Sequence, residues 1–169
     1  AVTPLLIYSP VRAWMGQIQL NYEKRDYYDL ETRDADYLQA APAVKYTFAG
    51  NHVLMLSGSF FRETADAEYY SNTGWDVALT SELRIWKSTI LYGKGLFRDT
   101  RYDERETLAP ETRKDQQWQG GAGFRQMFSL HKVNDFSLDL GYQHSDTSST
   151  FDIYENQRDL VTLSTTWRW

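Results

Sequence analysis

The chain has 169 residues, a formal net charge of −5 and no cysteine. The acidic balance argues against a nucleic-acid partner because no basic surplus is available to neutralise phosphates, and the lack of cysteine excludes disulfides and thiolate metal sites. Aromatic residues make up 15% of the chain, a share typical of surfaces with one apolar and one wet side, such as membrane interfaces.

Apolar and polar residues alternate with a period of two along most of the chain, which predicts an all-β structure. We expect about eight strands, in chain order near residues 12–28, 35–49, 52–62, 74–87, 89–101, 116–129, 135–146 and 158–169. Each range can supply the ~9–11 residues that a tilted membrane-crossing strand needs. Residues 1–11 are expected to be a short periplasmic lead-in or part of a preceding strand, and residues 12–169 to form one barrel.

The connections between these strands alternate in length. Short connections read "AGNH", "WKST" and "LHKVND", whereas the others are long and polar, such as "KRDYYDLETRDADY" and "DTRYDERETLAPETRKDQQ". A soluble sandwich gives no reason for such sorting. An outer-membrane barrel explains the alternation, because its tight turns face the periplasm and its long loops face outside. The pattern therefore predicts a transmembrane antiparallel up-and-down β-barrel with short periplasmic turns and long extracellular loops.

Aromatic residues cluster at the ends of the apolar strand faces, and small or aliphatic residues lie between them. In 74–87, for example, Trp75, Val77 and Leu79 alternate with polar or small residues. This arrangement matches a hydrocarbon-facing band flanked by aromatic girdles. Pro42 is the weakest point of the strand prediction, since proline inside a strand removes one hydrogen-bond donor from the sheet. The residues predicted at the membrane interfaces are Trp14, Tyr22, Trp75, Trp118, Tyr142, Trp167 and Trp169.

The opposite strand faces carry charged residues that would point into the lumen. An eight-stranded barrel is just wide enough to be filled by side chains, so buried charges there must be paired. We expect an ion-pair network that closes the lumen; a wider, wet pore with a cationic bias is the alternative and would favour anionic solutes. The predicted lumen-facing residues are Glu23, Lys45, Asp76, Glu82, Arg84, Lys94, Arg98, Arg125, Asp139 and Arg168.

Only the three histidines raise the question of enzymatic activity. His52 and His131 fall in short turns, whereas His144 lies beside Ser145 near the outer end of a strand. Outer-membrane lipid hydrolases use His as base and Ser as nucleophile. Adjacent strand residues point to opposite faces, so His144 and Ser145 cannot easily form such a pair. We therefore expect a non-enzyme, without catalytic residues, metal or cofactor.

The final segment, "LVTLSTTWRW", resembles the end of outer-membrane β-barrel proteins, which finish with alternating apolar residues and a C-terminal aromatic residue recognised by the barrel-assembly machinery. Val161, Leu163, Trp167 and Trp169 occupy these positions; the family usually ends in Phe, so Trp is a departure. The region from Arg98 to Trp169 loosely resembles barrels linked to tetratricopeptide domains, of the surface-lipoprotein assembly modifier and exopolysaccharide exporter type. The shared features are a polar residue pair before a Gly-rich strand in "RKDQQWQGGAGFRQMF", a "Y-x-x-S" hairpin and the "R-D-x-V" opening of the final strand.

This resemblance implies a location in the bacterial outer membrane. The implied partners are outer-membrane lipids and lipopolysaccharide, the assembly machinery through the C-terminal strand, and a periplasmic or surface protein. The expected function is that of a non-enzymatic structural or translocation-associated barrel. Its alternatives are a lipid-modifying hydrolase using His144, and a diffusion porin if the chain is part of a wider barrel. Barrel closure is expected between the final strand and either the strand around Trp14 to Tyr22 or a strand that precedes Ala1.

Overall fold

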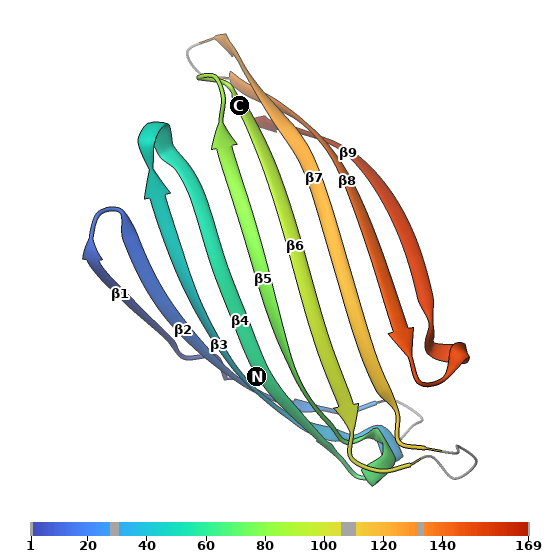
Figure 1. Ribbon diagram of the computed structural model, residues 1–169. Helices are drawn as coiled ribbons and strands as arrows, with labels where there is room; N and C mark the ends of the chain where they lie inside the picture. Colours follow the sequence, from blue (N-terminus) through green and yellow to red (C-terminus); the bar gives the residue numbers. More distant parts are fainter. Residues whose placement is uncertain (1, 28–30, 106–110, 132–133, 169) are drawn as a thin grey trace.

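In the part of the chain that the computed structural model describes, nine strands form one antiparallel sheet (Figure 1). The structure describes residues 2–27, 31–105, 111–131 and 134–168, and within them contains no α-helix. Four short 3-10 helices lie in the connections: η1 (Glu31–Arg33), η2 (Ala49–Asn51), η3 (Glu68–Tyr70) and η4 (Asp152–Tyr154). The strands are β1 (Leu5–Val11), β2 (Trp14–Arg25), β3 (Ala35–Phe48), β4 (His52–Ala65), β5 (Asn72–Arg84), β6 (Thr89–Tyr102), β7 (Lys114–His131), β8 (Asn134–Ser149) and β9 (Asn156–Arg168).

The predicted all-β, up-and-down antiparallel order is confirmed, because each strand pairs with the next one along the chain. The described residues form nine strands, one more than the eight ranges expected, and the additional one lies in residues 1–11, where part of a strand was one of the two expectations. The additional strand is β1, in which Leu5 to Tyr8 pair with Gln19 to Gly16 of β2. The register shifts between Tyr8 and Val11, where Pro10 has no N–H to donate to the ladder.

Of the two expected seams, the one between the last strand and β2 is wrong. Gly16 of β2 pairs with Tyr8 of β1 on one side and with Val44 of β3 on the other. Both edges of β2 are therefore occupied along the segment that was expected to close the barrel. In the structure β1 and β9 lie at opposite edges of a curved sheet that is not closed (Figure 1).

Short and long connections alternate, as the sequence predicts. Residues 12–13, 49–51 and 85–88 connect strands at one end of the sheet, which we call the turn end. The connections at the other end, the loop end, span residues 26–34, 66–71, 103–113 and 150–155. Asn51 has a φ of 67° in the second turn, a left-handed conformation that asparagine tolerates better than most residues.

Pro42 lies within β3 without disturbing its register. It faces Ile18 of β2, and the pairing of β3 with β4 continues from Ala40–Phe60 to Ala43–Ser57 in the same register. The missing proline donor thus interrupts the ladder locally and leaves the strand intact.

The sheet has no second layer packed on it within the described residues, and few apolar side chains are buried. The buried hydrophobic residues are Ala35, Ala43, Phe61 and Ala65. Large apolar side chains are instead exposed on every strand, for example Phe60 at 68% and Val161 at 69%. Soluble monomers rarely expose contiguous apolar patches above a few hundred Å², so exposed apolar side chains on every strand call for a covering environment.

Candidate functional site: the two faces of the sheet

The strand register separates two chemically different faces of the sheet. Residues that pair across strands share a face, and successive residues of a strand alternate between faces. We call the face that carries Asp76 and Arg98, which pair across β5 and β6, the inner face, and the opposite face the outer face. The predicted lumen residues with described side chains all lie on the inner face: Glu23, Lys45, Asp76, Glu82, Arg84, Lys94, Arg98, Arg125 and Asp139. Arg168 pairs with Asp135 at the end of β9, and its side chain lies outside the described part.

Two ion pairs join the predicted lumen residues. Arg98 donates to Asp76 at 2.8 Å, and the Ser59 hydroxyl donates to the same carboxylate at 2.8 Å. Arg125 donates to Asp139 at 2.8 Å, and the Tyr92 hydroxyl donates to that carboxylate at 2.5 Å. The expected network is therefore present only in part.

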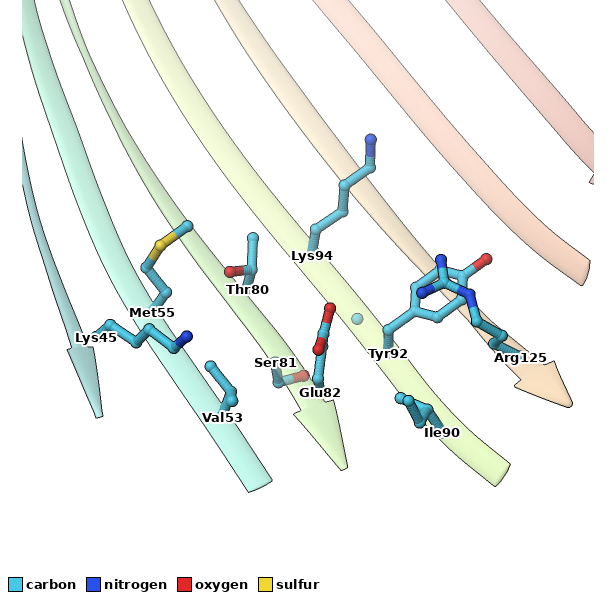
Figure 2. A pocket seen from close by; sticks show the side chains of 11 residues that line it. Lys45, Val53, Met55, Thr80, Ser81, Glu82, Ile90, Tyr92, Lys94 and Arg125 are labelled. Carbon is cyan, nitrogen blue, oxygen red and sulfur yellow. The ribbon is translucent and has the colours of Figure 1, made fainter. Parts of the chain in front are cut away.

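Lys45, Glu82 and Lys94 form no ion pair with any described residue. They surround a cavity of about 390 Å³ towards the turn end. Figure 2 shows them projecting from β3, β5 and β6 on the same side of the sheet, with Tyr92 and Arg125 beside them. This pocket combines apolar walls, such as Val53, Met55 and Ile90, with two ammonium groups and one carboxylate that have no ion-pair partner among the described residues.

A row of stacked side chains, which the sequence did not predict, crosses the inner face nearer the loop end. The Arg25 guanidinium lies 3.8 Å from the Tyr37 ring centre and pairs with Glu63 at 2.7 Å. Tyr37 in turn stacks on Phe61. The guanidinium carbon of Arg98 lies over the Phe61 ring, 5.3 Å from its centre. These contacts link β2, β3 and β4, and reach across β5 to Arg98 of β6, through cation–π and aromatic interactions.

A second unpredicted cluster surrounds Arg113 at the loop end. Its guanidinium hydrogen-bonds Asp115, with a shortest distance of 2.6 Å, and lies 3.3 Å from the Tyr154 ring centre and 4.5 Å from that of Tyr102. A cavity of about 330 Å³ adjoins it, also lined by Arg33 and other tyrosines. Arg113 therefore holds η4 and the ends of β6 and β7 together.

Sequence reasoning missed these two clusters because their members come from strand ends beyond the predicted ranges or bridge strands that are not neighbours. Glu63, Tyr102, Arg113 and Asp115 all follow or precede the strand limits expected from alternation. The available signal was the concentration of Tyr and Arg in the loop-end segments.

On the outer face, two belts of aromatic side chains flank an apolar band. Near the turn end, the turn-side belt includes ring contacts between Trp14 and Tyr46 at 4.4 Å and between Phe136 and Trp167 at 6.3 Å. The loop-side belt includes Trp75–Phe97 at 5.3 Å and Phe97–Trp118 at 4.5 Å. The turn-side belt consists of Trp14, Tyr46, Phe128, Phe136 and Trp167, and the loop-side belt of Tyr22, Phe60, Trp75, Phe97, Trp118 and Tyr142. Of the predicted interface aromatics, only Trp169 lies outside the described residues.

The separation of the belts can be judged from the strands. Trp14 and Tyr22 are eight positions apart on β2, and Trp118 and Phe128 ten positions apart on β7. At a rise of about 3.3 Å per residue these spacings are about 26 and 33 Å along the strand. With the tilt of about 40° found in membrane barrels, the band would be about 20–25 Å tall, close to the ~25 Å that such barrels present to lipid.

His144 lies on the outer face, and no nucleophilic side chain among the described residues bonds to it. Its Nδ1 is 2.9 Å from Asp159 Oδ1, which also accepts a hydrogen bond from the Tyr142 hydroxyl. Ser145 takes part in the inner-face register through its partner Gln119, and Ser148 Oγ bonds the Gln116 carbonyl. A base–nucleophile pair is therefore not assembled around His144.

Elsewhere the described residues offer little for catalysis or metal binding. His52 Nδ1 accepts a hydrogen bond from the backbone N–H of Arg84 and so has a role in the turn; the side chain of His131 lies outside the described part. No group of three or more potential metal ligands comes together among the described residues. Their helices include none with the length and apolar character needed to cross a membrane.

Comparison with protein-family models, with curated proteins and with solved structures finds no match for this chain.

Proposed function

We propose that this chain forms the membrane-spanning wall of a non-enzymatic outer-membrane β-barrel of a Gram-negative bacterium, with a structural or translocation-associated role. The observation that carries the proposal is the outer face, where an exposed apolar band lies between two aromatic belts. Lipid is the environment in which such a face is stable, because the band would contact acyl chains and the belts would lie at the two interfaces.

The inner face supports the same proposal by contrast. It carries the charged pairs Asp76–Arg98 and Arg125–Asp139 together with the open pocket around Lys45. Membrane barrels alternate apolar residues towards lipid and polar residues towards the lumen. A soluble sandwich would need the reverse arrangement, with its apolar faces packed on a second sheet.

The open edges of the sheet must be paired if it spans a membrane, because unsatisfied backbone groups are costly in hydrocarbon. β1 and β9 run in the same direction, since the order alternates through nine strands. Closure would therefore join them as a parallel pair or place further strands between them.

Refolding into lipid vesicles tests the proposal. We expect protein diluted from urea to float with the vesicles and to migrate faster on a gel before heating than after it. Tryptophan fluorescence should be quenched more by bromine near the headgroups than at the bilayer centre, because most tryptophans lie in the belts. A protein that stays dispersed in buffer without lipid or detergent would contradict the proposal.

A second candidate function is a path for anionic solutes through the lumen. Lys45 and Lys94 favour it, because neither ammonium group has an acidic partner among the described residues. Planar-bilayer recordings distinguish the two functions. Steady openings with a preference for anions, reduced in the variant with Lys45→Gln and Lys94→Gln, would support a solute path; absence of openings would support a plugged, structural barrel.

A further inference from the structure

The outer face carries a row of basic side chains on the loop side of its aromatic belt. Arg62 of β4 pairs with Thr73 of β5, Thr73 with Arg101 of β6, and Arg101 with Lys114 of β7. Four neighbouring strands thus place two guanidinium groups and one ammonium group in a single cross-strand row. At about 4.8 Å per strand the row spans about 14 Å.

Both arginines of this row are held by an acidic partner while most of each side chain stays exposed. Asp99 has a side chain that is 12% exposed, and its two oxygens receive hydrogen bonds from Arg101 Nε at 3.1 Å and from Gln116 Nε2 at 3.2 Å. Arg101 is thereby oriented through Nε while 69% of its side chain remains exposed. Arg62 pairs with Asp103 at 3.0 Å and contacts Thr73, with 58% of its side chain exposed.

The charge balance of the row favours an anionic partner. Its three cations face two acids, Asp99 and Asp103, and Lys114 forms no ion pair with a described residue. The acids fix the two arginines rather than cancel the whole charge, so one net positive charge and several N–H donors remain for a ligand.

The position of the row relative to the belt indicates what that ligand is. Arg62 lies two positions to the loop side of Phe60, and Lys114 four positions to the loop side of Trp118. If the belt lies at the interface, as under the proposed function, these cations lie at headgroup depth in the outer leaflet. On the turn side of the belt, the exposed Val77 and Leu79 face the acyl region.

We propose that Arg62, Arg101 and Lys114 bind the phosphates of a bisphosphorylated, acylated disaccharide lipid of the outer leaflet. Arginine and lysine both suit phosphate, arginine through paired N–H donors. A disaccharide with a phosphate at each end is long enough to reach more than one member of the row, while its acyl chains lie along the apolar band. This inference rests on the proposed function.

The test uses the refolded protein in detergent micelles and measures bound glycolipid by native mass spectrometry. The probes are the bisphosphorylated acylated glucosamine disaccharide, the same lipid with both phosphates removed, and inorganic phosphate. We expect the intact protein to prefer the bisphosphorylated lipid to the other two. The triple variant Arg62→Gln, Arg101→Gln, Lys114→Gln should weaken that binding by about tenfold or more, since hydrogen bonds to charged groups are lost.

The matched control removes the same residue types from the turn end: Arg12→Gln, Arg84→Gln and Lys87→Gln. It changes the net charge equally and should retain the binding of the intact protein. Equal binding of both glycolipids, equal loss in both triple variants, or a preference for inorganic phosphate over the glycolipid would overturn the inference.

Flotation with phosphatidylcholine vesicles, done in parallel, separates this inference from the proposed function. Intact protein that floats but shows no preference for the phosphorylated glycolipid would leave the proposed function standing and remove the lipid site. Intact protein that does not float would remove both.

Discussion

At the scale of single residues, glycines on the inner face make room for the side chains that cross it. A Cβ at Gly123 would lie 2.4 Å from the Leu140 carbonyl oxygen, and a Cβ at Gly74 would lie 2.3 Å from the Phe61 ring. Without these glycines Tyr92 could not reach across β7 to Asp139, nor could Phe61 lie across β5 below Arg98. The glycines are therefore part of the inner-face contacts, although no side chain of theirs takes part.

Gly123→Ala is expected to destabilise the protein by about 1–3 kcal/mol, because overpacking forces the backbone or Tyr92 to move. The matched control is Gly95→Ala, where no atom lies within 4 Å of the added Cβ; this change should be neutral or slightly stabilising, since alanine loses less conformational entropy on folding. Urea midpoints of the protein in vesicles measure both. Equal midpoints for the two variants would show that the crossing of Tyr92 does not depend on Gly123.

At the scale of elements, alternation predicted the strands well wherever one face is apolar and the other polar. It left β1 as one of two alternatives, a lead-in or part of a strand, because residues 5–8 (Leu5, Leu6, Ile7 and Tyr8) are apolar or aromatic at every position and show no period of two. It also could not predict the clusters around Tyr37 and Arg113. Arg98 reaches Phe61 across β5, and Arg113 joins β6, β7 and η4 at the loop end. Such contacts between elements leave no trace in the period of any one strand.

The loop-end connections contain one contact that should respond to pH. A hydrogen bond with Glu68, and then the charge of Glu68, raise the pKa of Glu104 above its ordinary value of 4.5. Because the pKa of Glu104 is higher in the folded protein than in the unfolded chain, its protonated form stabilises the folded state. This stabilisation is complete below the unfolded-state pKa and is lost as pH rises through the folded-state pKa. We therefore expect the contact between η3 and the 103–113 connection to loosen as pH rises above about 4.5.

The rate at which a protease cuts the 103–113 connection, followed against pH with a protease active across the range, measures this effect. Glu104→Gln should abolish the pH dependence, because a neutral amide can keep the hydrogen bond without titrating. Asp152→Gln, in the neighbouring η4, provides a control that should leave the dependence unchanged. An unchanged dependence in Glu104→Gln would assign it to another group.

At the scale of the whole molecule, the two aromatic belts run obliquely to the cross-strand rows. The row of Trp14 passes through Tyr46, Leu54, Ser81 and Gly93 to Ala122 of β7, six positions from Phe128. The row of Tyr22 likewise reaches Lys114, four positions from Trp118. Both belts thus shift towards the turn end from β2 to β7. If the strands are tilted to the membrane normal, a belt that stays at one depth in the membrane must shift along the strands in this way. The pattern of a single strand in the sequence could not reveal this shift.

A scan of arginine substitutions along β5 tests this arrangement directly. Leu79 lies mid-band on the outer face, Ile85 lies just beyond the turn end of β5, and Thr80 lies on the inner face. If the band contacts lipid, Leu79→Arg should cost about 2–4 kcal/mol in vesicles and Ile85→Arg about 0–1 kcal/mol, because the cost of a cation falls towards the interface. Thr80→Arg should cost less than Leu79→Arg, since the inner face carries charged side chains and no second layer of described residues covers it.

Urea unfolding in vesicles measures all three variants. A cost at Thr80 larger than that at Leu79 would mean that the inner face is the packed one, as in a soluble sandwich, and would reverse the assignment of the two faces.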